Sequence, residues 1–81
     1  MSESFLRILS LVQSGDAKIS DHGYNELAAD NIFVRDVMAT VAAGIIVEDY
    51  PDFPKGPSVL VLQKDREGSA IHVVWGIPKG A

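Results

Sequence analysis

The sequence predicts an α+β fold in which two or three N-terminal helices pack on a small antiparallel meander sheet of three strands. Two observations lead to this fold class. Apolar residues recur at helical spacing in the first half of the chain, and β-branched residues gather in short runs from Ile45 onward. At 81 residues the chain is short enough for one domain, residues 1–81, with a correspondingly small core.

The first helix is predicted over residues 4–14, with Ser4 as its cap. One apolar face supports it, formed by Phe5, Ile8, Leu9 and Val12. A second helix is expected after Ser20 or Asp21, either of which is a suitable N-cap. Its buried residues are expected to be Tyr24, Leu27 and Ala28.

The third helix is predicted within "IFVRDVMATVAAG". Its apolar face consists of Val34, Val37, Met38, Val41 and Ile45. Gly44 is placed to end the helix in a left-handed cap. The strands then follow as "IIVEDY", "SVLVLQK" and "AIHVVWGI". The proline-rich "PDFPKGP" forms a loop between the first two, because its prolines cannot donate ladder hydrogen bonds.

The segment "DREG" predicts a four-residue hairpin loop, with Gly68 at a positive φ. This loop would place Lys64 opposite Ser69 and fix which side chains share a face. The face toward the helices would hold Ser58, Leu60, Leu62, Ile71, Val73 and Trp75. The other face would hold Val59, Val61, His72 and Val74, which is apolar enough that a partner is expected to cover it.

Composition limits the classes of function. Seven Lys and Arg residues stand against eleven Asp and Glu, for a formal net charge of −4, so the charge that nucleic-acid binding draws on is scarce. With zero cysteines there is no disulfide framework and no Cys-based zinc site. Apolar runs are too short for a membrane span, and a cytoplasmic location is expected.

Candidate chemical groups are few. Phosphate-binding glycine loops, metal-ligand spacings and nucleophile elbows are absent from the sequence, so no cofactor and no metal is expected. Glu48, Asp49 and Asp52 lack the regular spacing of a calcium loop. His22 and His72 remain as an acid/base pair, and the alternative for each is a structural role. Phe53, in the proline loop, is the aromatic residue expected to touch a partner.

Several short motifs together carry a family resemblance. They are Ser20-x-His22 at the start of the second helix, the glycine before an acidic strand (Gly44, Glu48, Tyr50), the proline and glycine loop, and the "HVV" strand with His72. From about Ile19 to Ile77 the chain resembles a bacterial family catalogued as domain of unknown function 4258. The resemblance implies a RelE-like domain, similar to the RelE and MqsR ribonuclease toxins of toxin–antitoxin modules.

The chain departs from the family pattern at two places. Family members commonly carry arginines at the positions of Glu26 and Asp30, so charge that would contact phosphate is reversed. Members also continue past the "HVV" strand into a further strand, whereas this sequence stops at Ala81. A domain lacking that strand would keep one sheet face and one edge uncovered.

Two functions therefore compete. The favoured one is a toxin-like domain acting mainly through protein–protein contact, with a second copy or an antitoxin-like partner, through Val59, Val61, Val74 and Phe53. The alternative is a ribonuclease toxin in which His22 and His72 act as acid and base and Lys64 or Arg66 holds phosphate. Whether the domain is an enzyme stays open, and the acidic charge disfavours RNA as a ligand.

Overall fold

A computed structural model describes residues 2–79 of the chain. Ala81, to which the expectation of a missing C-terminal strand referred, lies outside the described residues. The elements are α1 (Glu3–Gln13), α2 (Asp21–Ala29), α3 (Val34–Thr40), a 3₁₀ turn η1 (Val41–Ala43), β1 (Ile45–Tyr50), β2 (Ser58–Lys64) and β3 (Ala70–Gly76). The strands form one antiparallel sheet in the order β1-β2-β3, which confirms the predicted α+β meander.

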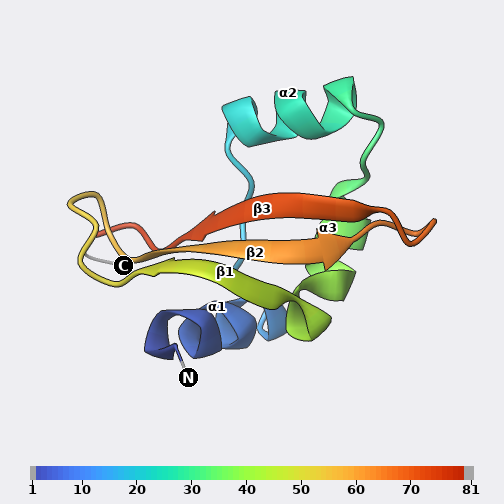
Figure 1. The fold of residues 1–81 in the computed structure, drawn as a ribbon. Coiled ribbons are helices and arrows are strands. Elements are labelled where there is room, and N and C mark those ends of the chain that lie inside the picture. Colours follow the sequence, from blue (N-terminus) through green and yellow to red (C-terminus); the bar gives the residue numbers. More distant parts are fainter. Residues whose placement is uncertain (1, 80–81) are drawn as a thin grey trace.

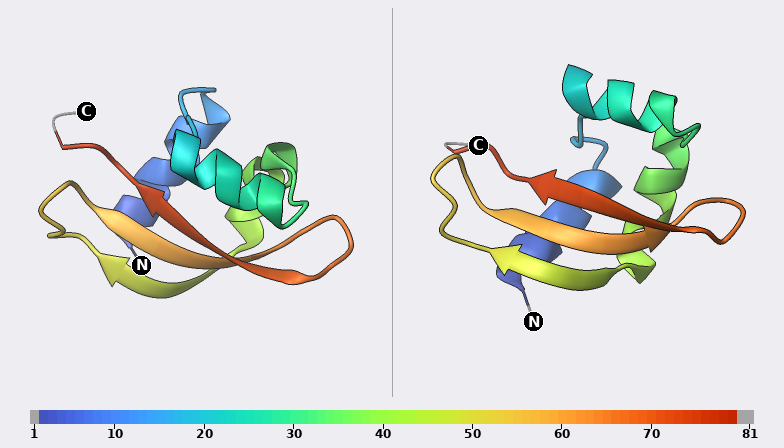
Figure 2. Two further views of the ribbon diagram at one scale, coloured as in Figure 1. Left: turned by 90° about the horizontal axis from the view of Figure 1, so that it is seen from above. Right: turned by 45° about the horizontal axis from the view of Figure 1, so that its top comes forward.

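The helices leave one face of the sheet without a cover. Helices α1 and α3 cross behind it, and α2 stands beyond the edge formed by β3 (Figures 1 and 2). The core between α1, α3 and the sheet consists of Phe5, Ile8, Val37, Val41, Val59, Val61, Trp75 and Ile77. On the opposite side, none of the helices within residues 2–79 covers the sheet (Figure 2).

The predicted register of the hairpin between β2 and β3 is wrong by one residue. Lys64 lies opposite Ala70, not Ser69, and Trp75 lies opposite Val59, not Ser58. The cause is the loop, in which the Asp65 N–H donates to the Ser69 carbonyl at 2.9 Å, so that residues 66–68 alone form the turn. Gly68 has the expected positive φ of 82°.

This shift turns every side chain of β2 to the other face. Val59 and Val61, predicted on the uncovered face, are fully buried in the core. Leu60 and Leu62, predicted in the core, lie on the uncovered face. The β3 assignments are confirmed on the core side, since Trp75 is buried there.

Two helix predictions are also corrected. The N-cap of α1 is Ser2, whose Oγ accepts from the Phe5 N–H at 3.0 Å, and not Ser4. Helix α2 is capped by Ser20 as expected, but within Asp21–Ala29, all of which the structure describes, no side chain is buried. Tyr24 is 56% exposed and Ala28 is exposed, while Leu27 alone of the three packs partly against the core.

Gly44 does not form a left-handed cap. Its φ and ψ of −72° and 159° are extended, and the helical segment ends in the 3₁₀ turn η1. Glycine is required there for space, because a Cβ atom would overlap the Cγ1 atom of Val61. Ile45, predicted on the helix face, is the first residue of β1 and is 65% exposed.

A buried polar residue joins the sheet to α3. The Gln63 side chain, 2% exposed, donates from Nε2 to the Val37 carbonyl at 2.8 Å and to Thr40 Oγ1 at 3.1 Å. Its Oε1 accepts from the Trp75 indole N–H at 2.6 Å. Because both ends of the amide are paired, the desolvation cost of this side chain is offset.

Candidate functional site

The uncovered side of the sheet, here called the open face, consists of three cross-strand rows. They are Ile45–Leu62–His72, Glu48–Leu60–Val74 and Tyr50–Ser58–Gly76, since residues directly opposite each other share a face. Val74 and Ile45 are 72% and 65% exposed. The first two rows are mainly aliphatic, although the exposed side of an antiparallel sheet ordinarily carries polar residues.

An irregularity in β1 shapes this face. Ile46 lies opposite Val61 and Glu48 lies opposite Leu60, so Val47 is an extra residue of a β-bulge. The bulge turns Glu48 to the open face, where its Oε2 accepts from the Tyr50 hydroxyl at 2.7 Å. This hydrogen bond raises the pKa of Tyr50 above its ordinary value, because the neutral phenol is the donor.

A groove lies between α2 and the edge of β3. Its wider part has a volume of about 570 Å³, and its floor includes Met38, Val73 and Trp75. A narrower part continues toward the hairpin loop. Both parts are bordered by Glu26 and Leu27 of α2 and by His72 of β3. The groove exists because α2, poor in apolar side chains, is not packed down on the sheet.

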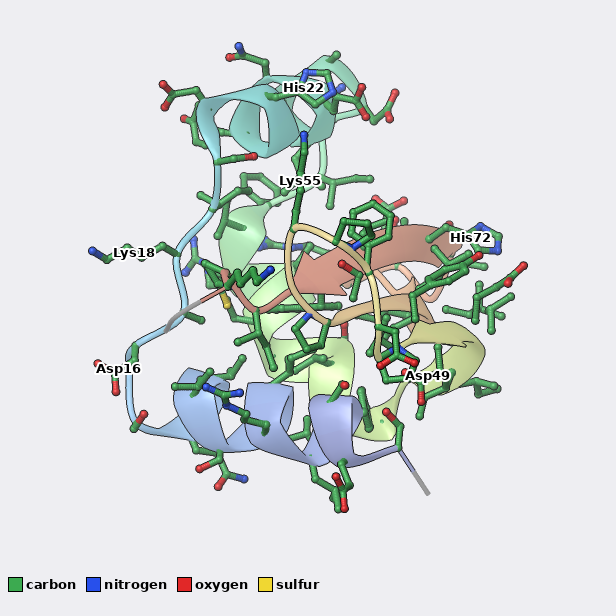
Figure 3. The ribbon with its side chains drawn as sticks, turned by 90° about the vertical axis from the view of Figure 1, so that its left-hand side faces the viewer. Asp16, Lys18, His22, Asp49, Lys55 and His72 are labelled. Carbon is green, nitrogen blue, oxygen red and sulfur yellow. The ribbon has the colours of Figure 1, made fainter. Side chains whose placement is uncertain are left out.

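The two histidines border this groove but do not meet. His22 projects from α2, and its Nε2 lies 3.2 Å from Glu26 Oε1. His72 projects from the open face, and Figure 3 shows His22 on α2 and His72 on β3 pointing away from each other. Both side chains are exposed. One scissile bond held between them would have to span the groove, so the geometry of a preformed acid/base pair is missing.

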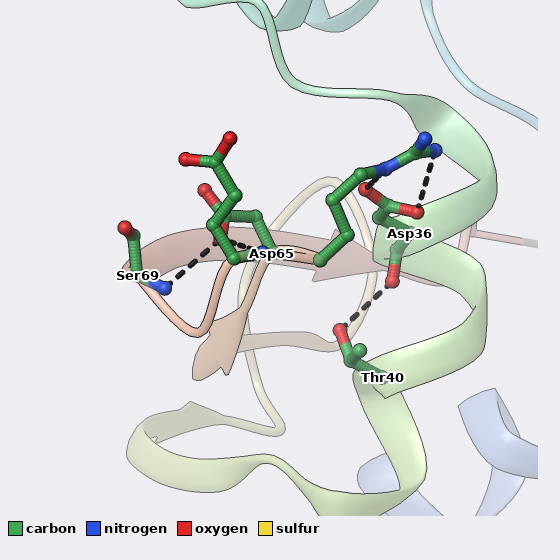
Figure 4. A network of polar contacts seen from close by, with 6 residues as sticks. Asp36, Thr40, Asp65 and Ser69 are labelled. Carbon is green, nitrogen blue, oxygen red and sulfur yellow. Dashed lines mark hydrogen bonds and ion pairs between the residues drawn. The ribbon is translucent and has the colours of Figure 1, made fainter.

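Lys64 and Arg66 differ in their surroundings. Lys64 is exposed at the end of β2. The Arg66 guanidinium donates from Nε and Nη2 to the Asp36 carboxylate at 2.9 and 3.1 Å (Figure 4) and lies 4.1 Å from the centroid of the Phe33 ring. A bidentate pair of this kind ties the hairpin loop to α3.

The ion pair shifts both groups away from their ordinary values. Hydrogen bonding to Arg66 lowers the pKa of Asp36, and hydrogen bonding to Asp36 raises the pKa of Arg66. Asp36 is almost completely buried by area, while half of the Arg66 side chain reaches solvent. Since the Arg66 charge is already matched by a carboxylate, its attraction for phosphate is reduced.

The residues predicted to contact a partner fall in different places. Val59 and Val61 lie in the core and present nothing to a partner. Val74 is on the open face, and Phe53 is exposed in the loop between β1 and β2. Sequence reasoning missed Ile45, Leu60 and Leu62, which the correct register places beside Val74.

Glu48 and Asp49 do not converge on a cation. They lie opposite Leu60 and Val59 respectively, and so belong to opposite faces of the sheet. Among the described residues, no group of three or more His, Cys, Asp or Glu side chains is arranged to hold a metal ion. No helix within residues 2–79 is long and apolar enough to cross a membrane.

Comparison with known proteins gives one match. The sequence model of a family described as "Domain of unknown function (DUF4258)" matches residues 19–81, from the segment before α2 to the end of the chain. No curated protein and no solved structure matches the chain. The open face and α2 therefore lie inside the matched region, as does the groove beside β3 apart from Lys18, whereas α1 lies outside it.

Proposed function

The chain belongs to the DUF4258 family, and from that premise we propose that it acts mainly through protein–protein contact, with a second copy of itself covering the open face. The observation that carries this proposal is the aliphatic composition of that face. Its rows hold Ile45, Leu60, Leu62 and Val74, with no helix of the described chain over them. Exposed apolar patches of this kind mark association surfaces in soluble proteins.

The arrangement of the rows on the open face is compatible with a twofold dimer. Glu48 lies on the outer strand β1 and His72 on the other outer strand β3. A twofold axis parallel to β2 would place β1 of each copy over β3 of the other, at the spacing of about 10 Å typical of packed sheets. Because this rotation keeps each cross-strand row at its own level, Glu48 of one copy would lie over Val74 of the other and Ile45 over His72, while the Leu60 and Leu62 side chains meet their counterparts at the centre.

Solution mass tests this proposal. Multi-angle light scattering at micromolar concentration should give twice the mass of one chain. Val74→Lys, which places a charge in the open face, should give the mass of one chain. Leu6→Lys is the matched control, because Leu6 is 48% exposed on α1, on the other side of the molecule, and this variant should remain a dimer. A monomeric parent, or a dimer that survives Val74→Lys, contradicts the proposal.

A ribonuclease toxin of the RelE or MqsR kind is the second candidate. It is supported by the position of His22 and His72 on one groove. Against it stand Glu26, beside His22, and the pairing of Arg66 with Asp36. General acid–base help is worth about 10²–10⁴ in rate, but it acts only on phosphate that is already held.

The test of this candidate is single-turnover incubation with mixed-sequence RNA at low salt. We expect the parent to cleave poorly or not at all. Cleavage that disappears in His22→Ala or His72→Ala would make the domain an enzyme. The double variant Glu26→Arg plus Asp30→Arg should bind RNA more tightly than the parent, because it adds positive charge at Glu26 of α2 and at the C-cap residue Asp30.

An antitoxin-like protein is the alternative partner for the open face.

A further inference from the structure

The edge of β3 that faces α2 carries unpaired backbone groups. At the two ends of the hairpin, the Asp65 N–H donates to Ser69 and the Ile77 N–H donates to Pro57. Hydrogen-bonded pairs alternate along an antiparallel ladder, so Ile71, Val73 and Trp75 bond to β2. The N–H and C=O groups of the residues between them, Ala70, His72, Val74 and Gly76, therefore point away from β2 and toward the groove.

The groove beside this edge suits an extended chain. Its floor is apolar, with Met38, Val73 and Trp75 below the strand edge and Leu27 on the α2 side. No strand within residues 2–79 pairs with this edge of β3. An added strand would satisfy the outward backbone groups, and its alternate side chains would enter the groove.

The charges around the groove define the chemistry of the occupant. Glu26, Asp30 and Asp65 border the narrower part. Lys18 is the one Lys or Arg residue among the groove-lining residues that the structure describes, and it borders the wider part only. The edge is therefore acidic over the half nearest the hairpin loop, which attracts a segment carrying lysine or arginine.

We propose that this groove binds a basic, extended segment of a partner protein by β-strand addition to β3. This inference rests on the proposed function, because both have the domain act by binding protein. It adds the groove as a second binding surface, distinct from the open face, with a basic segment as its ligand. A second copy of this chain fits the groove less well, because it could offer only its edge strands β1 and β3. Strand β1 carries the acidic residues Glu48 and Asp49, and β3 carries neither Lys nor Arg.

Amide hydrogen exchange measured by NMR tests the inference, with a short synthetic peptide alternating lysine and valine as the probe. In the free protein, the outward amides of His72 and Val74 should exchange much faster than those of Val73 and Trp75. At a peptide concentration of about ten times Kd, their exchange should slow by about tenfold. Unchanged exchange at His72 and Val74 in the presence of bound peptide would overturn strand addition.

Two altered peptides separate backbone pairing from charge. A basic peptide N-methylated at alternate residues cannot donate to β3 and should not bind. A peptide alternating glutamate and valine should bind more weakly than the basic one by about tenfold or more. Equal binding of the N-methylated peptide would contradict strand addition, and equal binding of the acidic peptide would contradict the charge assignment.

A charge-reversal variant tests the protein side. Glu26→Lys on α2 plus Asp30→Lys at its C-cap, both exposed, should weaken binding of the basic peptide by about tenfold. Asp16→Lys plus Asp52→Lys changes net charge equally at exposed sites outside the groove and should bind like the parent apart from a small general effect. Equal affinities of the two variants would overturn the proposal.

The same variants keep this inference distinct from self-association. Glu26 and Asp30 lie outside the open face, so the Glu26→Lys plus Asp30→Lys protein should keep the solution mass of the parent. Peptide binding by a monomeric parent would support the groove while contradicting the open-face dimer. A dimer that fails to bind the peptide would do the reverse.

Discussion

Replacing Gln63 by leucine tests the buried connection between the sheet and α3. The substitution keeps the side chain near its original volume but removes three hydrogen bonds, to Val37, Thr40 and Trp75. The Trp75 indole N–H would then be buried without an acceptor. Its partner Gln63 is 2% exposed, so water has little access to replace the lost amide.

The expected cost follows from these contacts. A buried group left without its partner costs about 1–3 kcal/mol, and Gln63→Leu affects one indole donor and one backbone acceptor. We therefore expect the free energy of unfolding to fall by about 2–4 kcal/mol. For 81 residues the total stability should be about 4–12 kcal/mol, so the variant loses a large share of it.

Urea denaturation followed by far-ultraviolet circular dichroism measures this loss. Gln13→Leu, at an exposed position of α1, should change stability by less than about 0.5 kcal/mol. Trp75→Phe removes the indole donor, so the double variant with Gln63→Leu should be less destabilised than the sum of the single changes by about 1 kcal/mol or more. A Gln63→Leu protein as stable as the Gln13→Leu control, or strictly additive effects, would refute the reasoning.

Three further outcomes are expected. Trp75→Ala should cost about 3–5 kcal/mol and bring the domain close to unfolding, measured by the same denaturation. Because Arg66 lowers the pKa of Asp36, the ion pair stabilises the fold at pH values above the ordinary carboxyl pKa, and this stabilisation is lost as the pH falls through the lowered pKa of Asp36. The urea midpoints of the parent and of Asp36→Asn should therefore converge on acidification. A difference between the two midpoints that stays constant with pH would contradict this. Glu48→Gln should lower the pKa of Tyr50 in ultraviolet titration, and an unchanged value would argue against their hydrogen bond.

The face assignments in the sheet were only partly predictable from the local sequence. The inward residues of β3, which are Ile71, Val73 and Trp75, were predicted correctly. The four consecutive apolar residues of "SVLVLQK" do not show which side chains of β2 face the core. That assignment therefore depended on the length of the hairpin loop alone. Asp65 decided it, because its Oδ1 accepts from the Glu67 and Ser69 N–H groups and shortens the turn by one residue.

The candidate sites depended on relations that sequence does not carry. The open face needed the β2 register, so Val59 and Val61 were assigned to it in place of Leu60 and Leu62. The groove needed the position of α2, whose apolar spacing predicted burial that did not occur. The local sequence pattern does not fix how far α2 lies from the edge of β3. It also does not show that Arg66 pairs with Asp36, which is thirty positions away in the chain.

The most direct test of contact through the open face is an isotope-filtered nuclear Overhauser experiment on a mixture of labelled and unlabelled chains. It reports only contacts between different copies. The account predicts intermolecular contacts among the methyl groups of Leu60, Leu62 and Val74, and none at the core residues Val59 and Val61. Intermolecular contacts absent from all three open-face residues, or found at Val59 and Val61, would contradict it.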